Sequence, residues 1–397
     1  MQLGWIDFSK EERNKVLNVI HLLDEPGAVD ELGLGIIRDA FSDIFFPGTS
    51  TVQTRAKYFL IVPYILQEAG SGFYGSEINT ILRRIDEEER KCRDILIKTS
   101  SDGVIGSLVP NSWVLRTPSN IYWNGIKRLG IFNSDLSVKE YIGQTLFERS
   151  IKQAKKYGNR DKEAEENEKD DLDAGDIASM HFWNLGDTYH SDWRNGLTID
   201  LLPNEAIYLR GQIITHQRDS LLAYILKNNI DLSKYDSFGS FSADNMDKVN
   251  PEMAKLMKLA DSFNDLVGLI TSRFNIIVSQ GKNREATERW GELSYDLQRR
   301  AGVDLKALYT KLKIRNINLQ VFLLRVQEAF FNNDIDLVDE LIVRQEVHRK
   351  GSSRAKTKHI GEYPEQEWIG FYILDYRFSP SKRILRDIMN SEVMGNV

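Results

Sequence analysis

The side chains best suited to chemistry form a short cationic and polar run that follows a turn at Pro47-Gly48. Hydroxyl residues after the turn predict a helix start near residue 50. Cations near a helix N-terminus are unfavourable unless an anion lies there, because backbone N–H groups already make that end partly positive. We therefore expect Arg55 and Lys57 to contact the phosphates of a nucleic acid. Gln53 and Tyr58 would contact a sugar or a base. The alternative is a solvated helix face whose cations pair with carboxylates elsewhere.

A second cationic region lies late in the chain, between residues 344 and 358. Glu346 is its one acidic residue, and Gly351-Ser352-Ser353 adds backbone donors and hydroxyl groups. In a protein that is acidic on average, such a local reversal of charge is suited to nucleic-acid phosphates. The alternative is a basic surface loop without a ligand. The cations of this region are Arg344, Arg349, Lys350, Arg354, Lys356 and Lys358.

Histidines near the second region define a catalytic alternative. His348 and His359 flank it and Asp375 follows, so a histidine could act as nucleophile or base in a nuclease or a nucleotide-acting enzyme. Elsewhere, His181 and His190 lie near several aspartates, but their spacing matches no metal-ligand motif. The sequence therefore predicts neither a bound metal nor a cofactor, and it assigns no catalytic residue.

Charge and cysteine content restrict the class of protein. The chain has 52 Lys and Arg residues against 58 Asp and Glu residues, a formal net charge of −6. This balance excludes a protein that coats nucleic acid over its whole surface. One cysteine, Cys92, excludes an internal disulfide and a cysteine-rich zinc module, and the apolar stripe around it predicts a buried position. Because no basic leader or long apolar span is present, we expect a cytoplasmic protein without membrane contact.

The elements that would position these residues are mostly helices. Residues 9–12 have the spacing of a capping box, and the helix that they open ends before Pro26-Gly27. Apolar periodicity between residues 251 and 347 predicts several helices with short connections, as in an antiparallel bundle. We expect a mainly α fold of helical bundle domains, with a few short strands near 197–201 and 368–378. The apolar residues of the first helix are Val16, Leu17, Ile20 and Leu23.

An acidic stretch is the predicted domain boundary. Residues 161 to 176 include nine acidic residues and only two basic ones, a composition that cannot bury a core. The predicted organisation is an N-terminal helical domain at 1–158, an acidic linker at 159–176 and a C-terminal, mainly helical domain at 177–397.

Several segments of the chain resemble an uncharacterised bacterial family, a domain of unknown function met in anti-phage defence islands beside helicase-like genes. The most specific segment runs from Phe46 to Phe59 and reads Phe-Pro-Gly-Thr-Ser-Thr-Val-Gln-Thr-Arg-Ala-Lys-Tyr-Phe. The resemblance implies a bacterial cytoplasmic protein with a role in defence, and it brings no catalytic residue. The looser segments are residues 4–9, 121–125, 205–209 and 374–378.

Together these observations lead to one leading hypothesis and two alternatives. The leading hypothesis is a nucleic-acid-binding, non-catalytic component of a bacterial anti-phage defence system, with DNA rather than RNA as its ligand and other defence proteins, including a helicase, as partners. The alternatives are a nuclease or nucleotide-acting enzyme with a His/Asp site near the C-terminal basic loop, and a helical scaffold that binds an acidic partner protein. The expected binding residues are Gln53, Arg55, Lys57, Tyr58, Arg349, Lys350, Arg354, Lys356 and Lys358.

Overall fold

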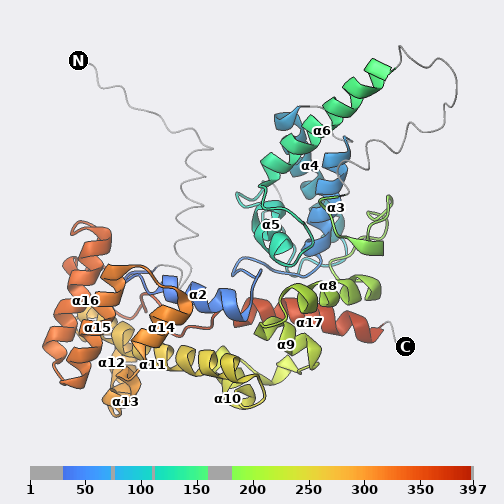
Figure 1. Ribbon diagram of the computed structural model, residues 1–397. Helices are drawn as coiled ribbons and strands as arrows, with labels where there is room; N and C mark the ends of the chain where they lie inside the picture. Colours follow the sequence, from blue (N-terminus) through green and yellow to red (C-terminus); the bar gives the residue numbers. More distant parts are fainter. Residues whose placement is uncertain (1–29, 73–76, 110–111, 160–180, 395–397) are drawn as a thin grey trace, which may run out of the picture. The chain divides into compact units, whose positions relative to one another are not determined.

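The computed structural model of the chain describes residues 30–72, 77–109, 112–159 and 181–394 (Figure 1). The chain forms two compact units, and each is assembled from segments that are far apart in sequence. Unit 1 comprises Met1–Ser42 and Tyr235–Tyr376, and unit 2 comprises Asp43–Lys234 and Arg377–Val397. The helix predicted after residue 9 lies outside the described residues.

The expectation of a mainly α fold is confirmed. All regular elements in the described ranges are helices, and the β-type pairing found there is an isolated bridge between Phe132 and Trp183. No helix in this part of the chain combines the length and the apolar character needed to cross a membrane. Helix α2 (Gly35–Phe45) contributes to both units. The helices of unit 2 are α3 (Tyr58–Ser71), α4 (Ile78–Leu96), α5 (Pro118–Arg128), α6 (Val138–Asn159), α8 (Pro203–His216), α9 (Leu221–Lys227) and α17 (Phe378–Met394), with single turns η1 (Gly186–Thr188) and η2 (Leu232–Lys234).

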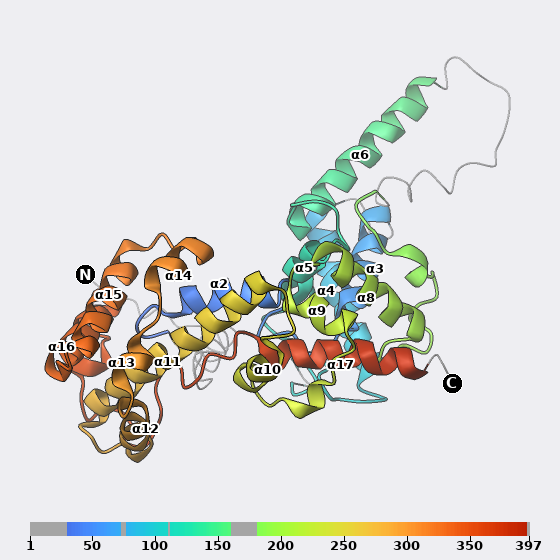
Figure 2. The ribbon, with the colours of Figure 1, turned by 60° about the horizontal axis from the view of Figure 1, so that its bottom comes forward.

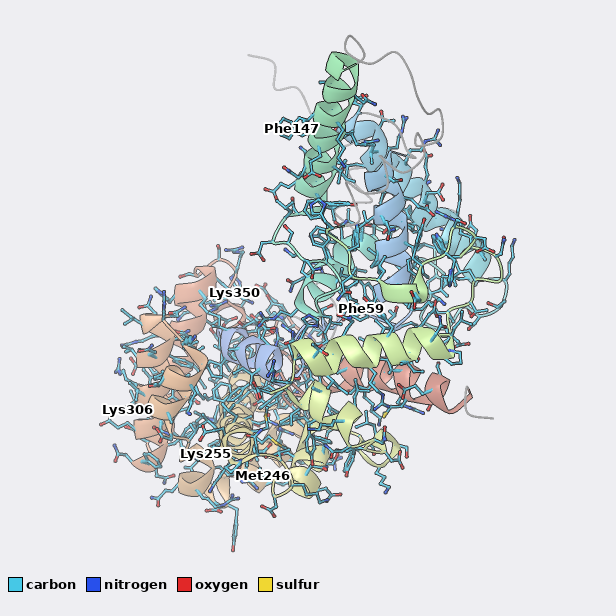
Figure 3. The ribbon with its side chains drawn as sticks, turned by 45° about the vertical axis from the view of Figure 1, so that its right-hand side comes forward. Phe59, Phe147, Met246, Lys255, Lys306 and Lys350 are labelled. Atoms are coloured by element: carbon cyan, nitrogen blue, oxygen red, sulfur yellow. The ribbon has the colours of Figure 1, made fainter. Side chains whose placement is uncertain are left out.

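Helix α3 forms the core of unit 2. Its residues from Phe59 to Leu66 are all apolar or aromatic, so the helix is buried on every side against α4, α5 and α6 (Figure 3, where Phe59 is labelled). Cys92 of α4 is buried, as expected. The predicted helix start near residue 50 is wrong: α3 begins at Tyr58, and residues 50–57 form turns and irregular backbone.

Unit 1 is a series of helices whose starts are readable in the sequence. Five of them begin at an Asn or Asp whose side-chain oxygen accepts the N–H three residues later, which satisfies one of the unpaired donors at a helix start. Figures 1 and 2 both show α15 beside α16. The helices are α10 (Phe238–Asn245), α11 (Pro251–Ser279), α12 (Arg284–Ser294), α13 (Leu297–Ala301), α14 (Leu305–Leu312), α15 (Ile317–Phe331) and α16 (Ile335–Lys350), with the single turn η3 (Lys356–Lys358).

The strands expected at 197–201 and 368–378 are wrong, since residues 197–201 and 368–377 are irregular and residue 378 begins α17. In the later segment, the hydrogen bonds that a neighbouring strand would make to the backbone come instead from a side chain. Asn275 of α11 accepts a hydrogen bond from Ile369 N at 2.7 Å and donates one to Ile369 O at 2.9 Å. Because the backbone groups are satisfied in this way, the β-prone, aromatic composition does not lead to a strand.

The structural division of the chain differs from the predicted one. The predicted linker at 159–176 lies almost entirely outside the described residues, and the segments on both sides of it belong to unit 2. A hydrogen bond from Asn133 N to Phe182 O at 2.8 Å and one from Trp183 Nε1 to Tyr141 OH at 2.9 Å join those segments. An acidic stretch can interrupt the sequence of a compact unit without separating two domains.

Glu89 gives unit 2 a testable pH dependence. This α4 side chain is buried, it accepts a hydrogen bond from Ser119 N at 2.6 Å, and burial raises its pKa from 4.5 to about 8. Between those two values the folded state retains a proton that the unfolded state releases, so stability falls as pH rises toward 8. We expect Glu89→Gln to remove this contribution. In urea titrations, the unfolding free energy of the variant minus that of the wild type should therefore increase from pH 5 to pH 8. An unchanged difference across that range would contradict the assignment.

Candidate anion-binding site

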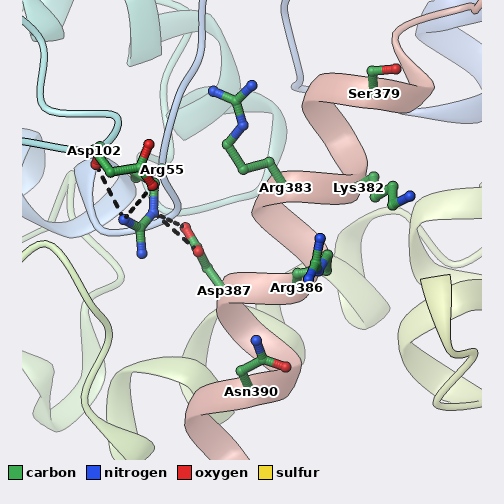
Figure 4. A pocket seen from close by; sticks show the side chains of 8 residues that line it. All are labelled: Arg55, Asp102, Ser379, Lys382, Arg383, Arg386, Asp387 and Asn390. Atoms are coloured by element: carbon green, nitrogen blue, oxygen red, sulfur yellow. Dashed lines mark hydrogen bonds and ion pairs between the residues drawn. The ribbon is translucent and has the colours of Figure 1, made fainter. Parts of the chain in front are cut away.

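The structure buries Arg55, the first cation of the early predicted site. Arg55 is 8% exposed, and its guanidinium donates to Asp387 at 3.0 Å (Figure 4). The same guanidinium donates to Asp200 at 2.6 Å. Asp102 lies 3.7 Å from the same group. Burial raises the pKa of Asp387, although its hydrogen bond and ion pair with Arg55 oppose that shift. Arg55 is therefore held by carboxylates of its own chain.

The other three residues of the early site also have internal roles. Lys57 is 4% exposed, and its ammonium group lies 2.8 and 2.5 Å from the two carboxylate oxygens of Glu205. The Gln53 amide donates to Gly48 O at 3.1 Å within its own turn. Tyr58 is buried, and its hydroxyl accepts a hydrogen bond from the backbone N–H of residue 105 at 2.9 Å. All four side chains have partners within the chain, and contact of this site with nucleic acid stays a prediction.

The backbone donors before α3 already have acceptors. Tyr122 of α5 accepts from Thr54 N at 2.8 Å and from Arg55 N at 3.1 Å, and it donates to Arg55 O at 2.9 Å. A carboxylate oxygen of Asp387 accepts from Ala56 N at 2.8 Å. An internal carboxylate thus occupies the position that an external anion was expected to fill. The backbone N–H groups and cations that predicted an anion site bind carboxylates of the same chain.

Tyr122→Phe should expose the structural role of this segment. The substitution removes one hydroxyl and leaves the buried N–H of Arg55 and its neighbour Thr54 without their acceptor. We expect the unfolding free energy to fall by about 2 kcal/mol, measured by urea denaturation. Tyr295→Phe, at a position of unit 1 that is 95% exposed, is the comparison, with an expected loss of about 0.5 kcal/mol or less. Equal losses in both variants would show that the Tyr122 hydroxyl has no special role.

The later predicted site is partly neutralised in unit 1. Lys350 and Lys356 both pair with the buried carboxylate of Glu31, Lys356 at 3.4 Å. Arg349 lies 3.7 Å from Asp30. Arg354 and Lys358 are exposed. Glu346, the one acidic residue of the region, is fully buried. It accepts hydrogen bonds from Lys356 N at 2.8 Å and from Thr357 N at 3.0 Å, which fix the loop that follows α16.

The residues of the catalytic alternative have separate partners. His348 Nε2 lies 3.2 Å from the Asn318 amide, and His359 Nδ1 lies 3.3 Å from Glu362. Asp375 accepts from Phe238 N at 2.8 Å, at the start of α10. Within the described ranges, no three His, Cys, Asp or Glu side chains are grouped so as to hold a metal ion.

A different basic site is present on α17 in unit 2. It is a pocket of about 350 Å³, and most of its lining comes from one face of this helix (Figure 4). Ser379, Arg383, Arg386 and Asn390 are all exposed and recur at intervals of four, three and four residues, so they share one helix face. The lining residues are Arg55, Asp102, Ser379, Lys382, Arg383, Arg386, Asp387 and Asn390.

The acids of α17 are paired with arginines from other elements. Asp387 pairs with Arg55, and Glu392 pairs with Arg210. Arg383 and Arg386, by contrast, lie exposed at the pocket. The eight lining side chains carry four cations and two carboxylates, a formal charge of +2 in a protein of net charge −6. The site is therefore suited to an anion with several negative charges.

The signal for this site was available in the sequence. The apolar residues Ile384, Leu385 and Ile388 are buried and define the inner face of the last helix. The opposite face then contains the two arginines with polar neighbours. The search for dense basic runs did not find the α17 site, because three cations on one helix are a weaker compositional signal than six cations in a loop.

A known family model covers part of this site. Residues 1–153 match a family of unknown function, DUF6361. The match includes the segment Phe46 to Phe59 and the pocket residues Arg55 and Asp102, but it ends before α17. It supports the expectation of an uncharacterised family for this part of the chain. Comparison with curated proteins and with solved structures gave no match.

Proposed function

We propose that this protein binds nucleic acid through the phosphate backbone, along the exposed face of α17. The observation that carries the proposal is the pair Arg383 and Arg386, which lie exposed at one pocket while the acids of the same helix are paired with other arginines. Guanidinium groups bind phosphate oxygens with two parallel hydrogen bonds, so two of them on one face suit successive phosphates.

The dimensions of the polar face fit a backbone rather than a single small anion. Ser379 and Asn390 are eleven residues apart, which corresponds to about 16 Å along a helix. The hydroxyl and amide at the two ends can donate to phosphate or sugar oxygens. Such contacts fix the position of a strand without reading its sequence, so we expect binding that is sensitive to salt and tolerant of sequence.

The wider role is also part of the proposal. The family resemblance supports a role in a bacterial anti-phage defence system. Within that role we propose a non-catalytic component with DNA as ligand and other defence proteins, including a helicase, as partners. Arg354 and Lys358 of unit 1 are exposed cations and form a secondary contact surface in this proposal.

A fluorescence anisotropy series tests the binding proposal. Labelled single- and double-stranded DNA and RNA of mixed sequence would be titrated with the full chain between about 50 and 200 mM salt. We expect binding whose logarithm falls linearly with the logarithm of salt concentration, and similar affinity for scrambled sequences. Polyglutamate is the control polyanion. Binding of polyglutamate with no binding of any nucleic acid would overturn the proposal and favour a scaffold for an acidic partner protein.

A further inference from the structure

A groove of about 330 Å³ lies in unit 1 between α11 and α14. Leu256 and Leu259 of α11 and Ala307 of α14 line it, and all three are half-buried. This volume is at the lower end of the range of ligand pockets, so the groove accepts a few side chains rather than a large ligand. None of the described residues that line it is aromatic, so a nucleobase finds no ring to stack on. The groove is therefore suited to aliphatic groups.

Three exposed lysines line the same groove. Lys255 and Lys258 belong to α11, and Lys311 belongs to α14 (Lys255 is labelled in Figure 3). The carboxylate of Glu252 lies 2.8 Å from the Lys255 ammonium and 2.9 Å from the Lys311 ammonium. With Glu252 and the lining carboxylate of Asp304 included, the formal charge is +1, in a protein of net charge −6. The groove therefore attracts anionic groups.

The other polar side chains of the groove already have partners. Asp304 accepts a hydrogen bond from Ala307 N at 2.8 Å, as the N-cap of α14. The Ser262 hydroxyl donates to Lys258 O at 2.9 Å. Lysine ammonium groups donate hydrogen bonds and accept none, and their flexible stems suit carboxylates in varied positions. A ligand must therefore supply negatively charged acceptors together with its aliphatic groups.

We propose that this groove binds an acidic segment of a partner protein, with aliphatic side chains between the two helices and carboxylates beside the lysines. The cations lie on both helices that border the groove, so the ligand needs negative charge on both sides of its apolar part. A fatty acid has one carboxylate at one end, whereas a peptide can carry acids on both sides of a leucine. Lys255 and Ser262 are seven residues apart on α11, a distance of about 10 Å that about three residues of an extended peptide would span.

Fluorescence anisotropy of the full chain with a labelled Asp-Leu-Asp-Asp-Leu-Asp peptide tests this proposal. We expect saturable binding, with affinity reduced by about tenfold or more when serines replace the leucines or asparagines replace the aspartates. Lys258→Glu/Lys311→Glu should lower the affinity by a similar factor, because two attractive charges become repulsive. Arg315→Glu/Arg325→Glu is the matched control, since both arginines are exposed in unit 1 and neither lines the groove. It should retain affinity within about threefold.

Filling the groove tests the apolar contact without a change of charge. Ala307→Phe should lower the peptide affinity by about tenfold or more, because the ring occupies the space of a ligand side chain, and thermal unfolding would verify that the variant is folded. Arg383→Glu/Arg386→Glu on α17 should leave peptide binding unchanged, so the result is independent of the nucleic-acid proposal. No binding of the peptide, or equal losses in the lysine and arginine variants of unit 1, would overturn the proposal. Binding of dodecanoate without binding of the peptide would assign the groove to a small amphiphile and would also overturn it.

Discussion

Reversing the charges of Arg383 and Arg386 together should lower the affinity for nucleic acid by about 100-fold at low salt. Both side chains are exposed at the α17 pocket, so the change replaces two phosphate contacts with two repulsions. It also removes the electrostatic attraction between Arg386 and Asp231. The slope of log affinity against log salt should become shallower by about two. Anisotropy titrations of Arg383→Glu/Arg386→Glu at several salt concentrations measure both quantities.

A matched pair of reversals separates a local contact from a general charge effect. Lys258→Glu/Lys306→Glu changes two exposed lysines of unit 1 (Lys306 is labelled in Figure 3) and alters the net charge by the same amount. We expect this control to retain affinity within about threefold, since neither lysine belongs to the proposed contact surface and salt screens the general effect of net charge. Equal losses in both double variants would mean that α17 is not the contact surface.

Lys57→Met should be among the most destabilising single substitutions in unit 2. Lys57 and Glu205 are each 5% exposed at the side chain and form a buried ion pair. Removing the ammonium leaves a buried carboxylate uncompensated, which costs about 3 to 5 kcal/mol. We expect a decrease of that size in the unfolding free energy from urea titration, with a correspondingly lower midpoint of thermal unfolding.

Two comparisons test the physical reason for this loss. Lys57→Met/Glu205→Met removes both charges and should recover part of the stability, because well-packed apolar side chains can replace a buried pair. Arg84→Met breaks an exposed pair with Glu87 on α4 and should cost less than about 1 kcal/mol. If the double variant is less stable than Lys57→Met, the loss comes from packing or from the hydrogen bond of Glu205 to Leu202 N, and the charge argument is wrong.

The early basic run shows how a motif for anion binding can serve folding instead. Its cations and backbone donors meet Asp387, Glu205 and Tyr122 of the same unit. The segment is therefore a junction between α3, α5, α8 and α17, and its specific sequence is explained by internal partners. We propose that anion binding occurs instead at α17, where Arg383 and Arg386 are exposed.

Local sequence determined most of the helices of this protein and several buried positions. Asn and Asp caps marked helix starts in unit 1, because a side-chain acceptor for an unpaired N–H is a local requirement. The unbroken apolar run of α3 explains why this helix is buried on every side, and the stripe around Cys92 predicted a core position. Each of these features depends on residues within a few turns of one another.

Only the tertiary structure decided which cations are available to a ligand. The carboxylates that hold Arg55 and Lys57 lie 332 and 148 residues away in sequence, and the acid that pairs with Lys350 and Lys356 precedes them by more than 300 residues. Composition counts charges but does not show which opposite charges the fold brings within 4 Å. Whether a cation is desolvated and paired depends on that proximity. The sequence therefore located the basic residues, and the fold determined that Arg383 and Arg386 of α17 are exposed.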